Sequence, residues 1–126
     1  MLTAMEEGKI TNTQKELAGR VHAILMDNLD RHVTIDELAQ NLFVSRTQIK
    51  TCFQRVYGMP VFSYTRRRRM EAASAMLADT DKSILEIAGR FGYENGSKFA
   101  SAFKSEMGIA PAFYRRQVRG EKEHIQ

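Results

Sequence analysis

Residues 34–58 read TIDELAQNLFVSRTQIKTCFQRVYG, and this stretch decides the fold. Residues 34–37 and residues 45–48 are capping-box patterns, and each is followed by apolar residues at helical spacing. Gly58 stands where the end of a helix favours a residue in the left-handed conformation. The stretch therefore predicts a short helix, a tight turn and a longer helix that ends at a glycine.

The same pattern returns near the end of the chain, about 50 residues later. Residues 34–66 align with residues 83–116 when one residue is inserted at the turn. The equivalent positions are Leu38 and Ile87, Ala39 and Ala88, Leu42 and Phe91, Ile49 and Phe99, Phe53 and Phe103, Gly58 and Gly108, and Tyr64 and Tyr114. Each copy has the arrangement of a helix-turn-helix, whose second helix enters the major groove of DNA.

Helical patterns also cover the rest of the chain. Apolar spacing predicts a first helix over roughly residues 12–30 and a long helix over residues 63–79, between the two copies. Pro111 suits the first turn of a last short helix. We therefore predict an all-α fold with two helix-turn-helix subdomains joined by a long linker helix, about seven helices in total.

The predicted organisation has five parts. They are a lead-in or linker tail (1–12), the first helix-turn-helix subdomain (13–62), the linker helix (63–80), the second helix-turn-helix subdomain (81–119) and a C-terminal tail (120–126). The character of the lead-in favours a fragment of a larger sensor-regulator over a complete protein, and both readings stay open.

Positive charge is concentrated in the two copies, although the net charge of +4 is modest. Residues 45–70 contain seven basic residues and no acidic one, and residues 95–119 contain five basic residues against one acidic. Two basic blocks predict two contacts with a polyanion. The alternative is that these residues only keep the exposed helix faces hydrated. A repeated hairpin for protein binding would not explain why the basic residues lie at the longer helix of each copy.

Other classes of function find little support in the sequence. Cys52 is the only cysteine, so an internal disulfide and a cysteine-rich zinc site are excluded, and we expect a buried, inert thiol. His22, His32 and His124 lie in different segments without the spacing of metal ligands. We expect no enzyme activity, no cofactor and no metal. No apolar run spans a membrane and no signal peptide is present, so we expect a cytoplasmic protein.

Taken together, these motifs resemble the AraC/XylS family of bacterial transcription regulators over roughly residues 15–117. The resemblance is carried by residues 35–40 (IDELAQ), by Ser45, Ile49, Phe53 and Gly58, by Tyr64, Arg69 and Ala73, by residues 83–88 (SILEIA) and 91–93 (FGY), and by Phe99, Phe103, Gly108, Pro111 and Tyr114. It implies two helix-turn-helix units joined by a long helix. It also implies sequence-specific binding to double-stranded promoter DNA, which controls transcription initiation.

The linker agrees with this resemblance. About 17 residues at 1.5 Å rise form a rod of roughly 25 Å. Such a rod can hold two reading helices near the ~34 Å separation of successive major grooves on one face of DNA. One chain is thus expected to cover two adjacent groove segments as a monomer. We expect this domain to bind neither a small molecule nor a membrane.

The resemblance also assigns the DNA-contacting residues. The base-contacting positions are Thr47, Lys50 and Thr51 on the first reading helix, and Gly96, Ser97 and Ser101 on the second. The expected phosphate contacts are Ser45, Arg46, Lys98 and Lys104. A contact of Lys50 with phosphate alone stays open. Other members of the family carry long amides or arginines at the positions of Gly96 and Ala100. The second unit is therefore expected to bind the DNA backbone and to leave most recognition of base sequence to the first unit.

Two further expectations concern arginines and an alternative function. On a helix, the run of residues 66–69 (RRRR) spreads around the circumference, so at most one or two of its arginines can face DNA. Arg69 is expected to pack or form an ion pair internally. The alternative function is a helical protein-interaction module, for example one that contacts RNA polymerase, with weak DNA specificity.

Overall fold

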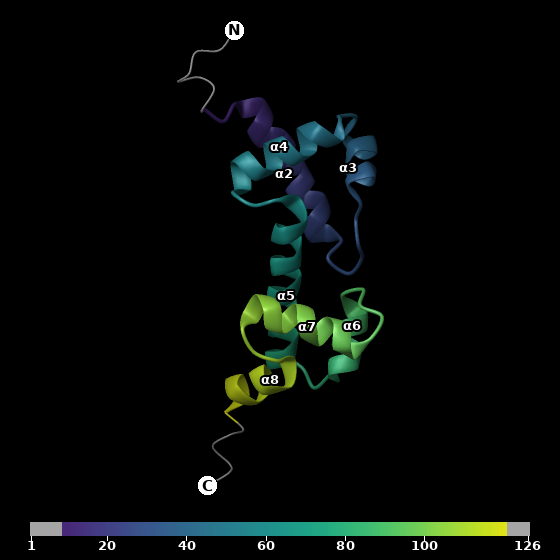
Figure 1. The fold of residues 1–126 in the computed structure, drawn as a ribbon, viewed down its shortest axis with the longest axis vertical. Coiled ribbons are helices and arrows are strands. Elements are labelled where there is room, and N and C mark those ends of the chain that lie inside the picture. The colour runs from purple at the N-terminus through teal and green to yellow at the C-terminus, as the bar shows by residue number, and fades with distance from the viewer. Residues whose placement is uncertain (1–8, 121–126) are drawn as a thin grey trace. The chain divides into compact units, whose positions relative to one another are not determined.

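The computed structural model describes residues 9–120. Its regular elements over this range are the helices α2 (Asn12–Asp27), α3 (Ile35–Leu42), α4 (Arg46–Tyr57), α5 (Val61–Asp79), α6 (Ile84–Arg90), α7 (Gly96–Met107) and α8 (Pro111–Arg119) (Figure 1). The predicted all-α fold is confirmed. Residues 1–8 and 121–126, which hold most of the predicted lead-in and tail, lie outside the described residues.

The helices begin where the capping patterns predict. Reciprocal capping boxes join Thr34 with Glu37, Ser45 with Gln48, and Ser83 with Glu86, with hydrogen bonds of 2.9–3.2 Å. Asn95 caps α7 by accepting a hydrogen bond of 2.8 Å from the backbone N–H of Lys98. The hydrogen bonds from Ser83 lower the pKa of the Glu86 carboxyl below its ordinary value.

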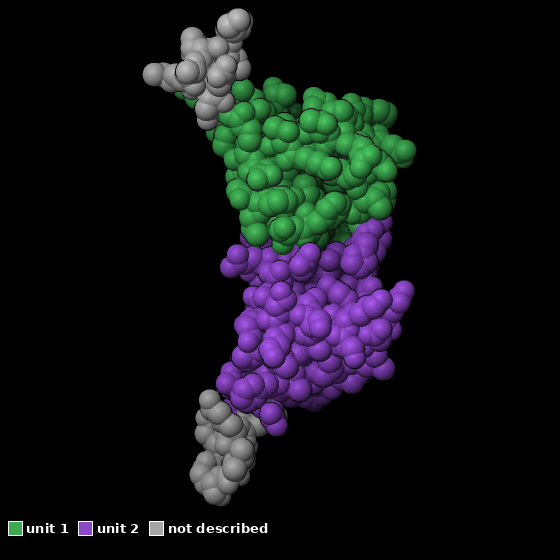
Figure 2. Space-filling view, in the orientation of Figure 1, with its two compact units in different colours: residues 1–28, 33–65 green, residues 29–32, 66–126 purple. Residues whose placement is uncertain are grey.

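The chain forms two compact units, which Figure 2 shows in different colours. The first unit contains Val33–Thr65 and the described part of Met1–Asn28. The second contains Leu29–His32 and the described part of Arg66–Gln126. Helix α5 contributes its first residues to the first unit and the rest to the second, so each unit is a helix-turn-helix closed by part of α5.

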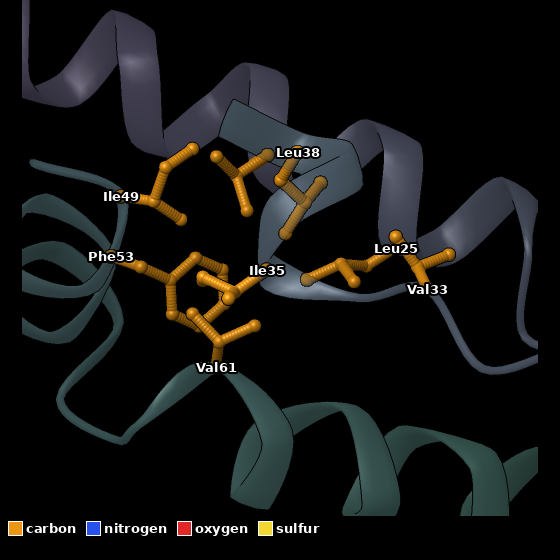
Figure 3. Packing of buried hydrophobic residues seen from close by; sticks show 8 residues of the cluster. Leu25, Val33, Ile35, Leu38, Ile49, Phe53 and Val61 are labelled. Carbon is orange, nitrogen blue, oxygen red and sulfur yellow. The ribbon is translucent and has the colours of Figure 1, made fainter. Parts of the chain in front are cut away.

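The core of the first unit lies between α2, α3, α4 and the start of α5. Figure 3 shows the side chains of Ile49 and Phe53 converging with those of Ile35 and Val61. Ile49 and Phe53 are completely buried. Because both lie on one face of α4, their burial fixes which face of this helix points outward.

Aromatic rings extend this core at the end of α4. The His22 ring stacks on Tyr57 at 4.8 Å, and its Nε2 lies 3.0 Å from the Tyr64 hydroxyl oxygen. Burial raises the pKa of Tyr57, and the neighbouring Tyr64 adds to this shift. The rings join α2, α4 and α5 within the first unit.

The second unit repeats the first in its core. Leu38, Ile49 and Phe53 and their equivalents Ile87, Phe99 and Phe103 are all completely buried. The ring centroids of Phe53 and Tyr64 lie 5.3 Å apart edge to face, and those of Phe103 and Tyr114 lie 5.5 Å apart in the same way. The glycines that end the long helices are both left-handed, with φ of 79° at Gly58 and 89° at Gly108. The internal repeat predicted from the sequence is therefore confirmed.

The tight turns of the two units also match, although their residues differ. Phe43 has a left-handed φ of 56° at the end of α3 and is 93% exposed. The equivalent residue after α6 is Gly92, with a φ of 83°. Both turns need the same backbone conformation, which is unfavourable for a residue with a side chain.

Two arginines at equivalent positions of the repeat bind backbone carbonyl groups, and both lie in the second unit together with their partners. Arg69 is 5% exposed, and its guanidinium donates to Leu29 O at 2.9 Å and to Arg31 O at 3.2 Å. Burial lowers the pKa of Arg69 from its ordinary value. Its repeat equivalent Arg119 donates to Ala78 O at 3.3 Å and to Thr80 O. The predicted internal packing of Arg69 is thus confirmed, with carbonyl oxygens as its partners.

Candidate nucleic-acid interface

Helix α4 presents one continuous polar stripe to solvent. Its members Thr47, Lys50, Thr51 and Gln54 follow the spacing i, i+3, i+4 and i+7, and all four are exposed. The opposite face of the helix is the buried face described above. The three residues predicted to contact bases from the first unit therefore share one accessible face.

The start of α4 adds features that favour an anion. The Ser45 hydroxyl oxygen accepts from the N–H of Gln48, which leaves the hydroxyl hydrogen to donate. Arg46 is exposed in the first turn, and its Nε lies 3.4 Å from the Asp36 carboxylate of α3. Because the N-terminal end of a helix carries partial positive charge, this turn suits a phosphate.

A hollow of about 320 Å³ lies beside this face, within the first unit. Thr47 and Thr51 line it from α4, and Thr13 and Leu17 line it from α2. Cys52 also borders the hollow but is only 8% exposed, so the predicted burial of its thiol is confirmed.

Helix α7 presents the equivalent stripe in the second unit. Its members are Ser97, Ala100, Ser101 and Lys104; Ala100 is half-buried and the other three are exposed. Gly96 begins the helix, and a Cβ added there would meet nothing within 4 Å. The second stripe therefore carries shorter side chains than the first, on a helix of the same length.

Several of the basic residues counted from the sequence have acidic partners. Lys98 Nζ lies 3.7 Å from a Glu94 carboxylate oxygen, and both side chains are exposed. In the arginine run, Arg66 lies 4.0 Å from Glu106, and Arg67 and Arg68 lie 3.9 Å and 2.9 Å from Glu71. Arg69 is buried, Arg66 pairs with Glu106, and Arg67 and Arg68 share Glu71, so the run does not form a single surface patch.

Sequence reasoning missed the structural use of the last arginines. Arg115 donates to Leu77 O at 2.9 Å and to Lys82 O at 2.7 Å, and Arg119 pairs with Asp81 at 2.9 Å. Both arginines belong to the second basic block of the sequence. The repeat contained a signal for this role, because Arg119 follows Arg69 by 50 residues. Lys98 and Lys104 are then the cations of this block that α7 itself exposes.

Neither a metal site nor a membrane-spanning helix is found within residues 9–120. Within this range, no group of three or more His, Cys, Asp or Glu side chains could hold a metal ion. None of the described helices is long and apolar enough to cross a membrane.

The fold and these two exposed faces define a double helix-turn-helix domain, and comparison with known proteins agrees. The sequence model of a family described as "Helix-turn-helix domain" matches residues 38–117. The HTH-type transcriptional activator AarP of Providencia stuartii is 29% identical over 112 residues, which are 89% of this chain and 83% of AarP. The melibiose operon regulatory protein of Escherichia coli K12 is 34% identical over 92 residues, which are 73% of this chain but 30% of that protein.

A solved structure gives the same fold. The DNA-binding domain of AdpA, a global transcriptional factor crystallised with a target DNA, superposes with a TM-score of 0.76 at 24% identity, over 84% of this chain and 96% of that one. The chain belongs to the AraC family of helix-turn-helix transcription regulators, and its fold is that of their DNA-binding domain. It is a transcription regulator and not an enzyme.

Proposed function

We propose that this chain binds double-stranded promoter DNA in a sequence-specific manner and thereby controls transcription initiation. The observation that carries the proposal is the repeated exposed stripe. In each unit the second helix of a helix-turn-helix turns one face to the core and leaves the opposite face accessible. A recognition helix needs this arrangement to enter the major groove. We propose that α4 and α7 of one monomer occupy adjacent groove segments, with α5 as the linker.

The two helices would divide the work of recognition. Thr47, Lys50 and Thr51 of α4 can reach base edges, and a lysine can donate to the N7 and O6 acceptors of guanine. Gly96 has no side chain, and the hydroxyl groups of Ser97 and Ser101 discriminate little between bases. We therefore assign most hydrogen-bonded readout to α4.

Phosphate contacts would fix the position of each helix on the duplex. Ser45 and Arg46 lie at the start of α4, and Lys98 and Lys104 lie on α7. Because phosphate oxygens are the same at every base pair, these contacts raise the affinity for all sequences alike. The surface pairs with Asp36 and Glu94 are exposed, so exchanging the carboxylate for a phosphate costs little.

The salt dependence of DNA binding tests the proposal. We expect about five to seven cations to neutralise phosphates, so the logarithm of affinity should fall against the logarithm of salt with a slope of about −4 to −6. Fluorescence anisotropy with a selected duplex and a random duplex of equal length measures this slope. Lys98→Ala and Lys104→Ala should each flatten it by about one unit and weaken both duplexes equally.

Arg20→Ala is the matched control, because Arg20 is an exposed cation on α2 that pairs with Glu16 at 3.2 Å. This change removes one positive charge that belongs to neither stripe and should leave the slope unaltered. A flat salt dependence of the unmodified chain would contradict DNA binding. That result would favour the protein-interaction module instead, with RNA polymerase as its first partner to test.

A further inference from the structure

We infer that α7 selects thymine in its half of the binding site, by packing the methyl group of Ala100 against the 5-methyl group of the base. This inference rests on the proposed function and adds the chemistry by which the second unit reads sequence. It replaces hydrogen-bonded readout with apolar contact at one position.

The composition of the α7 stripe carries the inference. Ala100 is the one member of this stripe, which lies wholly within the described residues, that lacks a polar side-chain atom. It is half-buried, and the exposed Ser97 and Ser101 stand three residues before it and one residue after it. The methyl group of Ala100 is therefore an apolar spot on a face of short hydroxyl groups. Thymine is the base whose major-groove edge carries a methyl group, so the two match in chemistry.

Gly96 makes close approach of the base possible. It lies four residues before Ala100, so both positions fall on one line along the helix. Side chains on a helix lean toward its N-terminus, and a side chain at position 96 would stand beside the Ala100 methyl. The space above Gly96 is open, since an added Cβ would meet nothing within 4 Å. At position 96, therefore, no side chain stands between an approaching base edge and the Ala100 methyl group.

The first unit does not share this feature. The residue of α4 equivalent to Ala100 is Lys50, an exposed cation, and the residue equivalent to Gly96 is Arg46. A long charged side chain at each position favours acceptors such as guanine N7 and O6 or phosphate. Methyl-based selection is therefore expected in the half of the site that α7 occupies and not in the other.

Replacement of thymine by uracil tests the inference directly, because uracil lacks only the 5-methyl group. The complete chain first selects its duplex from a random pool. The half-site whose preference is lost in Lys50→Ala belongs to α4, and the other half-site belongs to α7. Each thymine of the α7 half is then replaced by deoxyuridine, one at a time. One replacement should weaken binding roughly fourfold, the value of burying one methyl-sized group. The same replacements in the α4 half should change affinity less than twofold.

The protein variant completes a double-mutant cycle. In Ala100→Gly, the sensitive thymine and its uracil replacement should bind equally well. Ala102→Gly is the matched control, since it makes the same change on the core-packed side of α7 and should keep the fourfold ratio. The ratio is measured within one protein, so any general loss of stability cancels. A 5-methylcytosine in place of the sensitive thymine should bind better than cytosine by the same factor.

Two results would overturn the inference and leave the proposed function in place. One is a selected α7 half-site in which no thymine is sensitive to uracil, and the other is a fourfold ratio that persists in Ala100→Gly. A chain that binds no duplex in a salt-dependent manner would overturn both the inference and the proposed function.

Discussion

The first and second helix-turn-helix units have the same framework and different outer faces. The completely buried residues Leu38, Ile49 and Phe53 have completely buried equivalents, each long helix begins at a side-chain cap, and each ends at a left-handed glycine. Several outward positions carry different residues in the two units. In the repeat, Lys50 is equivalent to Ala100, Arg46 to Gly96, and Phe43 to Gly92. The comparison shows that the fold depends on the inward positions, while the outward positions are free to set what each unit contacts.

The strongest test of this comparison replaces the equivalent core phenylalanines. Phe53→Ala and Phe103→Ala should each lower the free energy of unfolding by about 3–5 kcal/mol, because a completely buried ring leaves a cavity. Urea unfolding followed by circular dichroism measures the loss. Phe62→Ala is the control, since Phe62 is 48% exposed and should cost much less. Losses under 1 kcal/mol at either core position would show that the two cores are not equivalent.

The carbonyl-binding arginine should have the next largest effect. Arg69→Ala leaves two backbone carbonyl groups without their donor and should cost about 1.5–3 kcal/mol of stability. The slope of DNA affinity against salt should not change, because this guanidinium does not face solvent. Arg66→Ala removes an exposed charge from the same run and should leave the melting temperature nearly unchanged. A flatter (less negative) salt slope in Arg69→Ala would instead show that this guanidinium contacts a phosphate.

Substitutions in the two exposed stripes should affect DNA affinity and base preference to different extents. Lys50→Ala should cost about 1–3 kcal/mol on the best site and relax the preference at one base position. Ser97→Ala should cost less and should shift the preference little, because a single hydroxyl discriminates weakly. Selection of sites from random duplexes, followed by affinity measurement, compares the two variants. Equal hydrogen-bonded information in both half-sites would contradict the division of labour.

Much of the framework could be predicted from the sequence. Capping boxes, terminal glycines and apolar spacing are local signals, and the repeat doubled their weight at positions such as Phe53 and Phe103. The role of Arg115 could not be predicted in the same way. Its partners are backbone carbonyl groups, which carry no sequence signal, and more than 30 residues separate them from this arginine.

The candidate site was predictable to a different depth. Helical spacing places Thr47, Lys50 and Thr51 on one face, and the structure agrees because Ile49 fixes the inward direction. The pairing of Arg46 with Asp36 was not predicted, since it depends on the angle between α3 and α4. Contacts with DNA also depend on the partner and stay predictions.

The smallest expected difference between the two units lies in their tight turns, at the equivalent residues Phe43 and Gly92. Gly92→Ala should cost about 1–2 kcal/mol, because it puts a side chain at a φ of 83° and a Cβ 3.3 Å from Asp30 O. Phe43→Gly should raise stability by roughly 0.5 kcal/mol, since relief of the left-handed strain outweighs the added chain entropy and the exposed ring loses little packing. Urea midpoints measure both changes. Phe43→Ala is the control, because it keeps the left-handed strain and should bring no gain. A loss of stability in Phe43→Gly would show that the ring contributes to the folded state despite its exposure.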